Sequence, residues 1–121
     1  MADAHDNPAV PPAYSVTEVE VLDPDGFKRY RQLAQAAVAQ YGGRFLVQGA
    51  EPIVAEGDWP SQQRLVVIEF PNMDQLRTWY DSTEYRIARS VARTALRRRL
   101  LFVEGVKNAP EDKISGDKRK A

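Results

Sequence analysis

The run RLVVIEF, residues 64–70, constrains the fold of this chain more than any other stretch. It is apolar almost without interruption, which is typical of a central strand covered on both faces. Successive side chains of a strand point to opposite faces, so Val66 and Ile68 lie on one face. Leu65 and Val67 lie on the other face. Helices of the same chain cover one face only, and a second copy of the sheet is the simplest cover for the other. The run therefore predicts a homodimer.

The segment before this run predicts a strand followed by a helix. Residues 14–21 alternate and are rich in β-branched side chains, as a strand requires. Asp23 is a suitable N-cap for a helix that begins at Pro24, and Gly42 and Gly43 end that helix. The inward stripe of the helix consists of Phe27, Tyr30, Ala34, Val38 and Tyr41.

The other elements complete a split β-α-β pattern. A strand at 44–50, with 53–54 as a candidate extension, and a turn at 57–61 precede the strand at 64–70. A short helix follows, capped by Asn72 with Gln75 at the capping-box position. The last two elements are a helix from Ser82 to about Arg97 and a strand at 100–106. This order predicts an α+β, ferredoxin-like βαββαβ subunit with a four-stranded antiparallel sheet and helices on one face. We expect this domain to span residues 13–106, between a disordered leader at 1–12 and a flexible polar tail at 107–121.

Composition excludes several classes of function. The 17 basic and 17 acidic side chains cancel, so no net charge draws the chain to nucleic acid or to a membrane surface. The chain has no cysteine, and its single histidine, His5, lies in the leader, which excludes thiolate chemistry and a histidine base within the domain. We expect no metal and no cofactor. No apolar run is long enough to cross a membrane and no signal peptide is evident, so we expect a cytoplasmic protein.

The stretch TWYDSTEYRIA, residues 78–88, is the first candidate for a ligand site. Trp79, Tyr80 and Tyr85 could wall a pocket between the helices and the sheet, where Trp79 would stack on a planar ligand and the phenols would orient it. The same residues are also explained without a ligand, with Ser82 as a helix N-cap and Tyr85 as a core residue. The two interpretations are compatible, because one ring can be core on one edge and pocket wall on the other.

Three strand carboxylates are the candidates for acid–base chemistry. A partly buried Glu18, Glu20 or Glu69 would have a raised pKa and could act as a general base where histidine is lacking. The alternative is an ion pair with Arg44, Arg64 or an arginine of the partner subunit. The proposed catalytic residues are Glu69 and Tyr85, and the proposed ligand-binding residues are Trp79, Tyr80, Ser82, Arg44 and Arg93.

Arg86, Arg89, Arg93 and Arg97 fall on one stripe of the last predicted helix. Such a stripe could follow phosphates, but the balanced charge and the lack of interleaved aromatic residues favour a solvated face. We therefore expect no nucleic-acid partner and keep Arg93 as a candidate anion contact at the mouth of a pocket. The glycines form neither a G-x-G-x-x-G pattern nor a P-loop, which argues against a nucleotide site.

The segments YGGRFLVQG, EGDWP, RLVVIEFPNMDQLRTWYDSTEY and LLFVEGV resemble domain-of-unknown-function family 1330, within the dimeric α/β-barrel superfamily. The resemblance covers roughly residues 14–106 and implies a ferredoxin-like subunit whose sheets pair face to face in a dimer. The superfamily includes cofactor-free monooxygenases, lactone isomerases, cyclases, haem-dependent enzymes and small-ligand sensors. Members of the family usually carry an arginine seven residues after the tyrosine that matches Tyr85. This chain has Ala92 there, with Arg89 and Arg93 nearby.

Two functions follow as hypotheses. The first is a cofactor-free enzyme, an isomerase, cyclase or monooxygenase-like protein, that acts on a small hydrophobic or aromatic substrate in the cleft between sheet and helices. The second is a non-catalytic ligand-binding or regulatory dimer that uses the same cleft.

Overall fold

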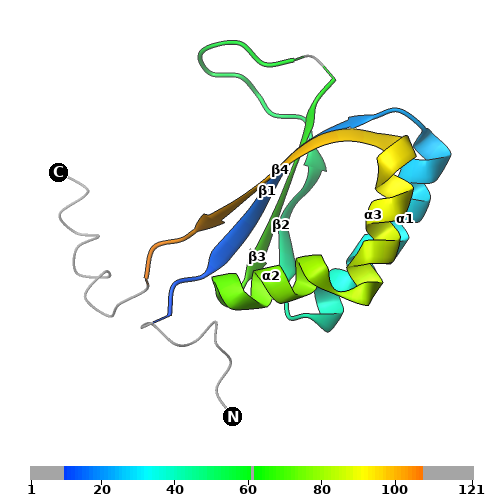
Figure 1. The fold of residues 1–121 in the computed structure, drawn as a ribbon. Helices are drawn as coiled ribbons and strands as arrows, with labels where there is room; N and C mark the ends of the chain where they lie inside the picture. The colour runs from blue at the N-terminus through cyan, green and yellow to red at the C-terminus, as the bar shows by residue number, and fades with distance from the viewer. Residues whose placement is uncertain (1–9, 61, 108–121) are drawn as a thin grey trace, which may run out of the picture.

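One antiparallel sheet in the strand order β2-β3-β1-β4 organises the chain (Figure 1). The computed structural model describes residues 10–60 and 62–107. The elements are β1 (Ala13–Val21), α1 (Pro24–Gln40), β2 (Arg44–Ala50), β3 (Arg64–Phe70), α2 (Met73–Asp81), α3 (Thr83–Ala95) and β4 (Leu96–Glu104). This order and sheet topology confirm the predicted ferredoxin-like α+β fold. The predictions for residues 1–9 and 108–121 lie outside the described residues.

The predicted caps form the helix ends. The Asp23 side chain accepts a hydrogen bond from the Asp25 N–H, and Pro24 occupies the first turn of α1. Gly42 has a φ of +80°, a conformation that favours glycine, and it follows directly on the C-cap residue Tyr41. Asp23 and Pro24 thus fix the start of α1, and the turn at Gly42 sets the direction in which the chain leaves α1 for β2.

Asn72 caps α2 through the Gln75 N–H, as predicted. The Gln75 side chain, however, donates from Nε2 to the Tyr41 carbonyl at 2.8 Å, so it ties α2 to the end of α1. Ser82 joins α2 and α3, because its Oγ donates to the Trp79 carbonyl and accepts from the Tyr85 N–H. The prediction that residues 78–88 form a helix junction is confirmed.

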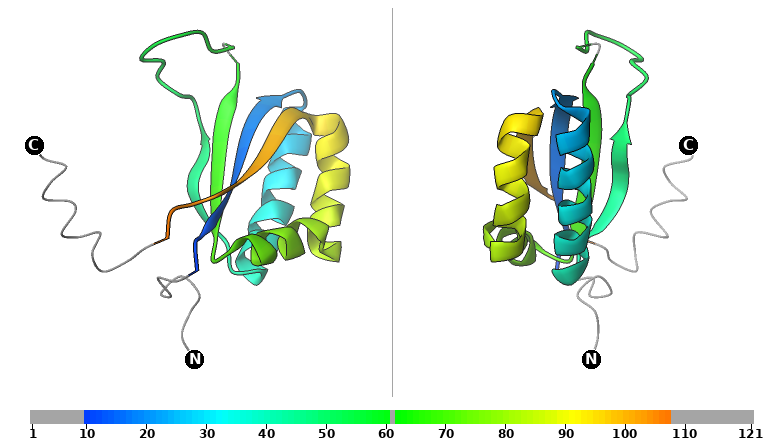
Figure 2. Two further views of the ribbon diagram at one scale, coloured as in Figure 1. Left: turned by 60° about the vertical axis from the view of Figure 1, so that its left-hand side comes forward. Right: turned by 90° about the vertical axis from the view of Figure 1, so that its right-hand side faces the viewer.

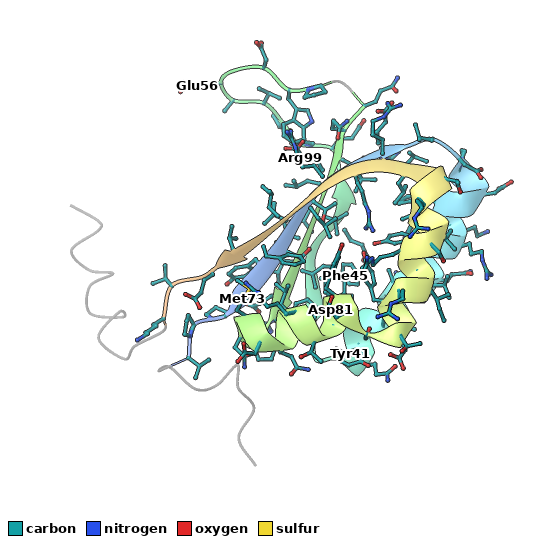
Figure 3. The ribbon with its side chains drawn as sticks, in the orientation of Figure 1. Tyr41, Phe45, Glu56, Met73, Asp81 and Arg99 are labelled. Carbon is teal, nitrogen blue, oxygen red and sulfur yellow. The ribbon has the colours of Figure 1, made fainter. Side chains whose placement is uncertain are left out.

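Helices α1 and α3 cover one face of the sheet and leave the other face open (Figure 2). Phe70 from β3, Leu76 and Trp79 from α2 and Tyr85 from α3 are at most 1% exposed and form the centre of the core. Figure 3 shows side chains filling the space between the sheet and these helices, with Phe45 of β2 among them. No helix in the described ranges is long and apolar enough to cross a membrane.

The open face of the sheet is apolar at its centre. Strand register places the following side chains on that face: Val16, Val47, Leu65, Val67, Leu101 and Val103. Leu101 and Val103 are 52% and 45% exposed. Both faces of β3 are therefore apolar, as its sequence predicted.

Three predicted boundaries are wrong. The last strand begins at Leu96 rather than Leu100, because Val19–Val21 of β1 pair with residues 96–98. The helix before it accordingly ends at Ala95 rather than near Arg97. Residues 53–54 do not extend β2, and Ile53 is 97% exposed.

Candidate functional site

Three polar side chains from three elements meet on the helix-covered face of the sheet. The hydroxyls of Tyr30 (α1) and Tyr85 (α3) lie 2.7 Å apart. Arg98 of β4 donates from one guanidinium nitrogen to Tyr30 Oη at 2.9 Å and to Tyr85 Oη at 2.8 Å. Its guanidinium carbon lies 5.2 Å from the centroid of the Tyr30 ring. We call these three residues the Tyr–Tyr–Arg cluster.

The cluster carries a positive charge that no carboxylate of the described residues neutralises. Burial raises the pKa of Tyr30 above its ordinary value of 10.0, and the Arg98 charge does not offset this, so the phenol stays neutral. Burial lowers the pKa of Arg98, but the two phenols beside it outweigh that effect and the net shift is upward. None of the described ion pairs includes Arg98. A guanidinium held by two phenols can donate further hydrogen bonds to an anionic oxygen.

A cavity between α1 and the sheet is bounded by this cluster. Its walls are mostly apolar, with Phe27, Phe45, Val66 and Ile68 among them, and Tyr30, Tyr85 and Arg98 supply polar groups. The cavity offers about 40 Å³ to the centre of a water molecule, which is room for a few waters. A larger ligand would have to displace side chains at the mouth, where the exposed Arg31 and Gln35 are the most readily moved.

Two further polar groups of the cavity walls are buried without a partner. Ser15 Oγ and Trp79 Nε1 make no hydrogen bond with any described residue. An unsatisfied buried donor costs about 1–3 kcal/mol, so such groups are rare in folded proteins and often mark functional sites. Both residues line the cavity. The two residues contribute other atoms to the walls, while these two polar atoms themselves are buried.

The structure brings some of the predicted site residues together. Trp79 and Tyr85 line the cavity, with ring centroids 4.2 Å apart. Tyr80 lies outside its walls, packs edge-on against Phe102 at 5.3 Å and carries the Arg89 guanidinium 4.3 Å above its ring. Ser82 serves as the helix cap and does not line the cavity.

Glu69 and Arg44 lie on the opposite, open face of the sheet. Glu69 accepts hydrogen bonds from Arg44 Nε at 2.6 Å and from Tyr14 Oη at 2.9 Å. Burial and this bond to Glu69 raise the pKa of the Tyr14 phenol. Glu69 is therefore separated from Tyr85 by the sheet. Its placement matches the alternative in which it forms an ion pair with Arg44.

The other two strand carboxylates also form ion pairs on the open face. Glu18 pairs with Arg99 at 2.7 Å and Glu20 with Arg97 at 2.8 Å. Both partners belong to the same chain and were not among the predicted ones. Arg97 thus lies on β4, and the predicted four-arginine helical stripe is shortened by one member.

Arg93 lies at a second hollow, lined by Arg89, Ala92, Arg93, Leu96 and Arg98. It does not line the cavity beside α1, but the two hollows share Arg98. No group of three or more histidine, cysteine, aspartate or glutamate side chains in the described ranges could hold a metal ion.

Sequence reasoning missed Tyr30 and Arg98 as site residues. Tyr30 was assigned to the inward stripe of its helix, which is correct, but nothing local showed that its hydroxyl meets Tyr85. Arg98 lies in the arginine run 97–99, for which no site role was predicted. Alternation along LRRRLLF, with Leu96, Leu100 and Phe102 directed inward, would have placed Arg98 on the covered face.

The family model described as domain of unknown function (DUF1330) matches residues 12–106. Among solved structures, the chain is similar to a protein of unknown function from Rhodopseudomonas palustris, at 17% identity and a TM-score of 0.63, over 80% of this chain and 84% of that one. It is similar to SnoaB, a cofactor-independent oxygenase from Streptomyces nogalater, at 14% identity and a TM-score of 0.59, over 84% of this chain and 100% of that one. A dimeric ferredoxin-like protein of unknown function from Thermobifida fusca is similar at 13% identity and a TM-score of 0.51, over 78% of this chain and 92% of that one. These likenesses show the fold. The comparison with curated proteins gives no match.

Proposed function

The chain belongs to the family described as domain of unknown function (DUF1330), and on that premise we propose that it is a cofactor-free enzyme acting on a small hydrophobic or aromatic substrate. The observation that carries this proposal is the Tyr–Tyr–Arg cluster at the wall of an otherwise apolar cavity. An apolar cavity with a few convergent polar groups is the usual form of a small-molecule site. The likeness to a cofactor-independent oxygenase supports the same class of function.

The cluster is suited to stabilising negative charge on a substrate oxygen. When a substrate loses a proton from carbon or from a phenol, the resulting enolate or phenolate oxygen needs donors that are already in place. Arg98 supplies a fixed positive charge, and the phenol hydroxyl that does not donate to its neighbour in the Tyr30–Tyr85 pair is a further donor. Isomerisation, cyclisation and self-activated oxidation each have routes that proceed through such an anion.

A non-catalytic binding function is the second candidate, and the composition of the cavity walls favours it. Among the described residues that line the cavity there is neither a carboxylate nor a histidine, so no side chain of high proton affinity stands beside the cluster. The predicted base Glu69 lies across the sheet. An enzyme built this way would need water, or the reaction partner of the substrate, to take the proton. A sensor or carrier needs no proton acceptor, because it binds its ligand without changing it.

We propose a homodimer in which the open faces of two sheets pack together. The apolar centre of this face and the exposure of Leu101 and Val103 require a cover. The three ion pairs of Glu18, Glu20 and Glu69 surround that centre. The similar protein from Thermobifida fusca is described as dimeric. Such pairing leaves the cavity of each subunit on the outer, helix-covered side.

A ligand screen followed by a product assay tests the function. We expect aromatic or keto-acid compounds to raise the melting temperature of the purified protein, and chromatography with mass detection to show conversion of at least one of them. Arg98→Met should abolish both effects and Tyr85→Phe should weaken them, whereas Arg86→Met, which removes an exposed arginine from the same helix as Tyr85, should leave them unchanged. Stabilisation without conversion of any hit would identify the non-catalytic alternative. Conversion that survives Arg98→Met would refute the proposed role of the cluster.

A further inference from the structure

A second hollow lies beside the cavity, between α3 and the edge strand β4. Three arginines line it, Arg89 and Arg93 from the helix and Arg98 from the strand. Arg98 also lines the cavity, so the two spaces meet at one side chain. We call the second hollow the arginine groove.

Within residues 10–60 and 62–107, the positive charge of the arginine groove has no counter-charge. None of the ion pairs in the described part of the chain involves its three arginines. Arg97 and Arg99, on either side of Arg98, each pair with a glutamate on the other face of the sheet. Like charges that share a concave surface repel one another and raise the local concentration of anions. The groove is therefore matched to an anion rather than to bulk water alone.

The three arginines differ in how firmly they are held. Arg89 donates to the Tyr80 carbonyl at 3.3 Å and stacks on the Tyr80 ring, so its guanidinium is fixed. Arg98 is fixed by Tyr30 and Tyr85. Arg93 is exposed and makes no hydrogen bond to a described side chain or carbonyl, so it is free to turn toward a ligand. Two fixed cations and one adaptable cation form a suitable receptor for a carboxylate or a phosphate.

We infer that the arginine groove binds the anionic group of the molecule whose apolar part enters the cavity. This inference rests on the function proposed above and narrows its substrate class to hydrophobic or aromatic acids. Arg98 lies between the two parts of the ligand, with its charge shared by the carboxylate or phosphate in the groove and the reacting oxygen in the cavity. A neutral analogue would keep the cavity contacts and lose those of the groove.

Nuclear magnetic resonance titrations of the full chain test the inference with three probes at constant ionic strength: inorganic phosphate, benzoate and benzamide. We expect phosphate to shift the arginine side-chain Nε–H signals in a saturable way, and benzoate to bind more tightly than its neutral isostere benzamide. Arg93→Met should weaken phosphate binding by about tenfold and remove the advantage of benzoate. Arg86→Met makes the same change of charge on α3 outside the groove and should alter both affinities by less than about twofold.

Several results would overturn the inference. They are the absence of saturable shifts with phosphate, equal weakening by Arg93→Met and Arg86→Met, or equal affinity for benzoate and benzamide. The proposed function fails in a different way. If neither benzoate nor benzamide perturbs the signals of cavity residues while phosphate still binds in an Arg93-dependent manner, the groove stands as an anion site and the assignment of the cavity is wrong.

Discussion

Replacing Arg98 by methionine should separate stability from ligand binding. The substitution removes two hydrogen bonds from a charged donor, to Tyr30 and to Tyr85, each of which contributes about 1.5–3 kcal/mol. It also removes a partly buried cation that lacks a carboxylate partner, which relieves a desolvation cost of several kcal/mol. The Tyr30 and Tyr85 hydroxyls still bond to each other. The two effects nearly cancel, so the free energy of unfolding should change by no more than about 1.5 kcal/mol.

The effect of the same substitution on ligand binding should be far larger. Removing the charged partner of an anionic ligand group typically costs about 2–5 kcal/mol, which is a loss of affinity of about thirtyfold or more. Tyr85→Phe provides a comparison, because it takes away one neutral donor and leaves Arg98 bonded to Tyr30. That variant should lose about 1 kcal/mol of stability and less affinity than Arg98→Met.

Urea unfolding at fixed protein concentration measures the first quantity, and titration with the best ligand of the screen measures the second. A loss of more than about 3 kcal/mol in the Arg98→Met variant, with an unchanged slope in urea, would show that the guanidinium is a structural link between α1, α3 and β4. The same variant with normal affinity would show that the charge does not face the ligand. Either result refutes the reasoning that assigns Arg98 to an anionic oxygen.

Three other predictions concern stability and assembly. The pKa of Tyr30 is raised in the folded chain, so the stabilisation that this residue contributes is fully present below pH 10 and is lost as the pH rises above it. The free energy of unfolding should fall there by up to about 1.4 kcal/mol per pH unit. Urea unfolding followed from pH 9 to 12 measures this slope, and Tyr30→Phe should reduce it. Ser82→Ala should lower the free energy of unfolding by about 1–2 kcal/mol because it deletes a buried cap, whereas the exposed neighbour Thr83→Ala should change it by less than about 0.5 kcal/mol; equal losses would contradict the capping role. Leu101→Lys on the open face should give monomers in sedimentation velocity at micromolar concentration, while Ile87→Lys, an equally exposed site on α3, should not; a wild-type monomer would remove the basis of the proposed dimer.

The parts of the fold that the sequence predicted are those that depend on neighbouring residues. Asp23, Asn72 and Ser82 cap their helices because each cap bonds to an N–H two or three residues away. The strand at 64–70 was predicted to its ends, because burial on both faces leaves a continuous apolar run. Signals of this kind need no knowledge of the rest of the chain.

The candidate site was only partly predictable because its contacts are long-range. Tyr30 and Tyr85 are 55 positions apart, and no local pattern reports that their hydroxyls meet. Trp79 and Tyr85 were found because aromatic residues crowd into one short stretch. Glu69 was grouped with Tyr85 by chemical type alone, and only the sheet register shows that it faces the other side.

The place of Arg98 follows from charge spacing along two paired strands. Glu18 and Glu20 are two residues apart on β1, and in the antiparallel register they oppose Arg99 and Arg97. Because side chains alternate between faces, the arginine between those two must point to the covered face, where no glutamate of β1 can reach it. The ion pairs that anchor β4 on the open face therefore place one cation among the helices. Tyr30 and Tyr85 accept two of its hydrogen bonds, both from one nitrogen, and do not neutralise its charge. An anionic ligand would supply both the missing acceptors and the counter-charge.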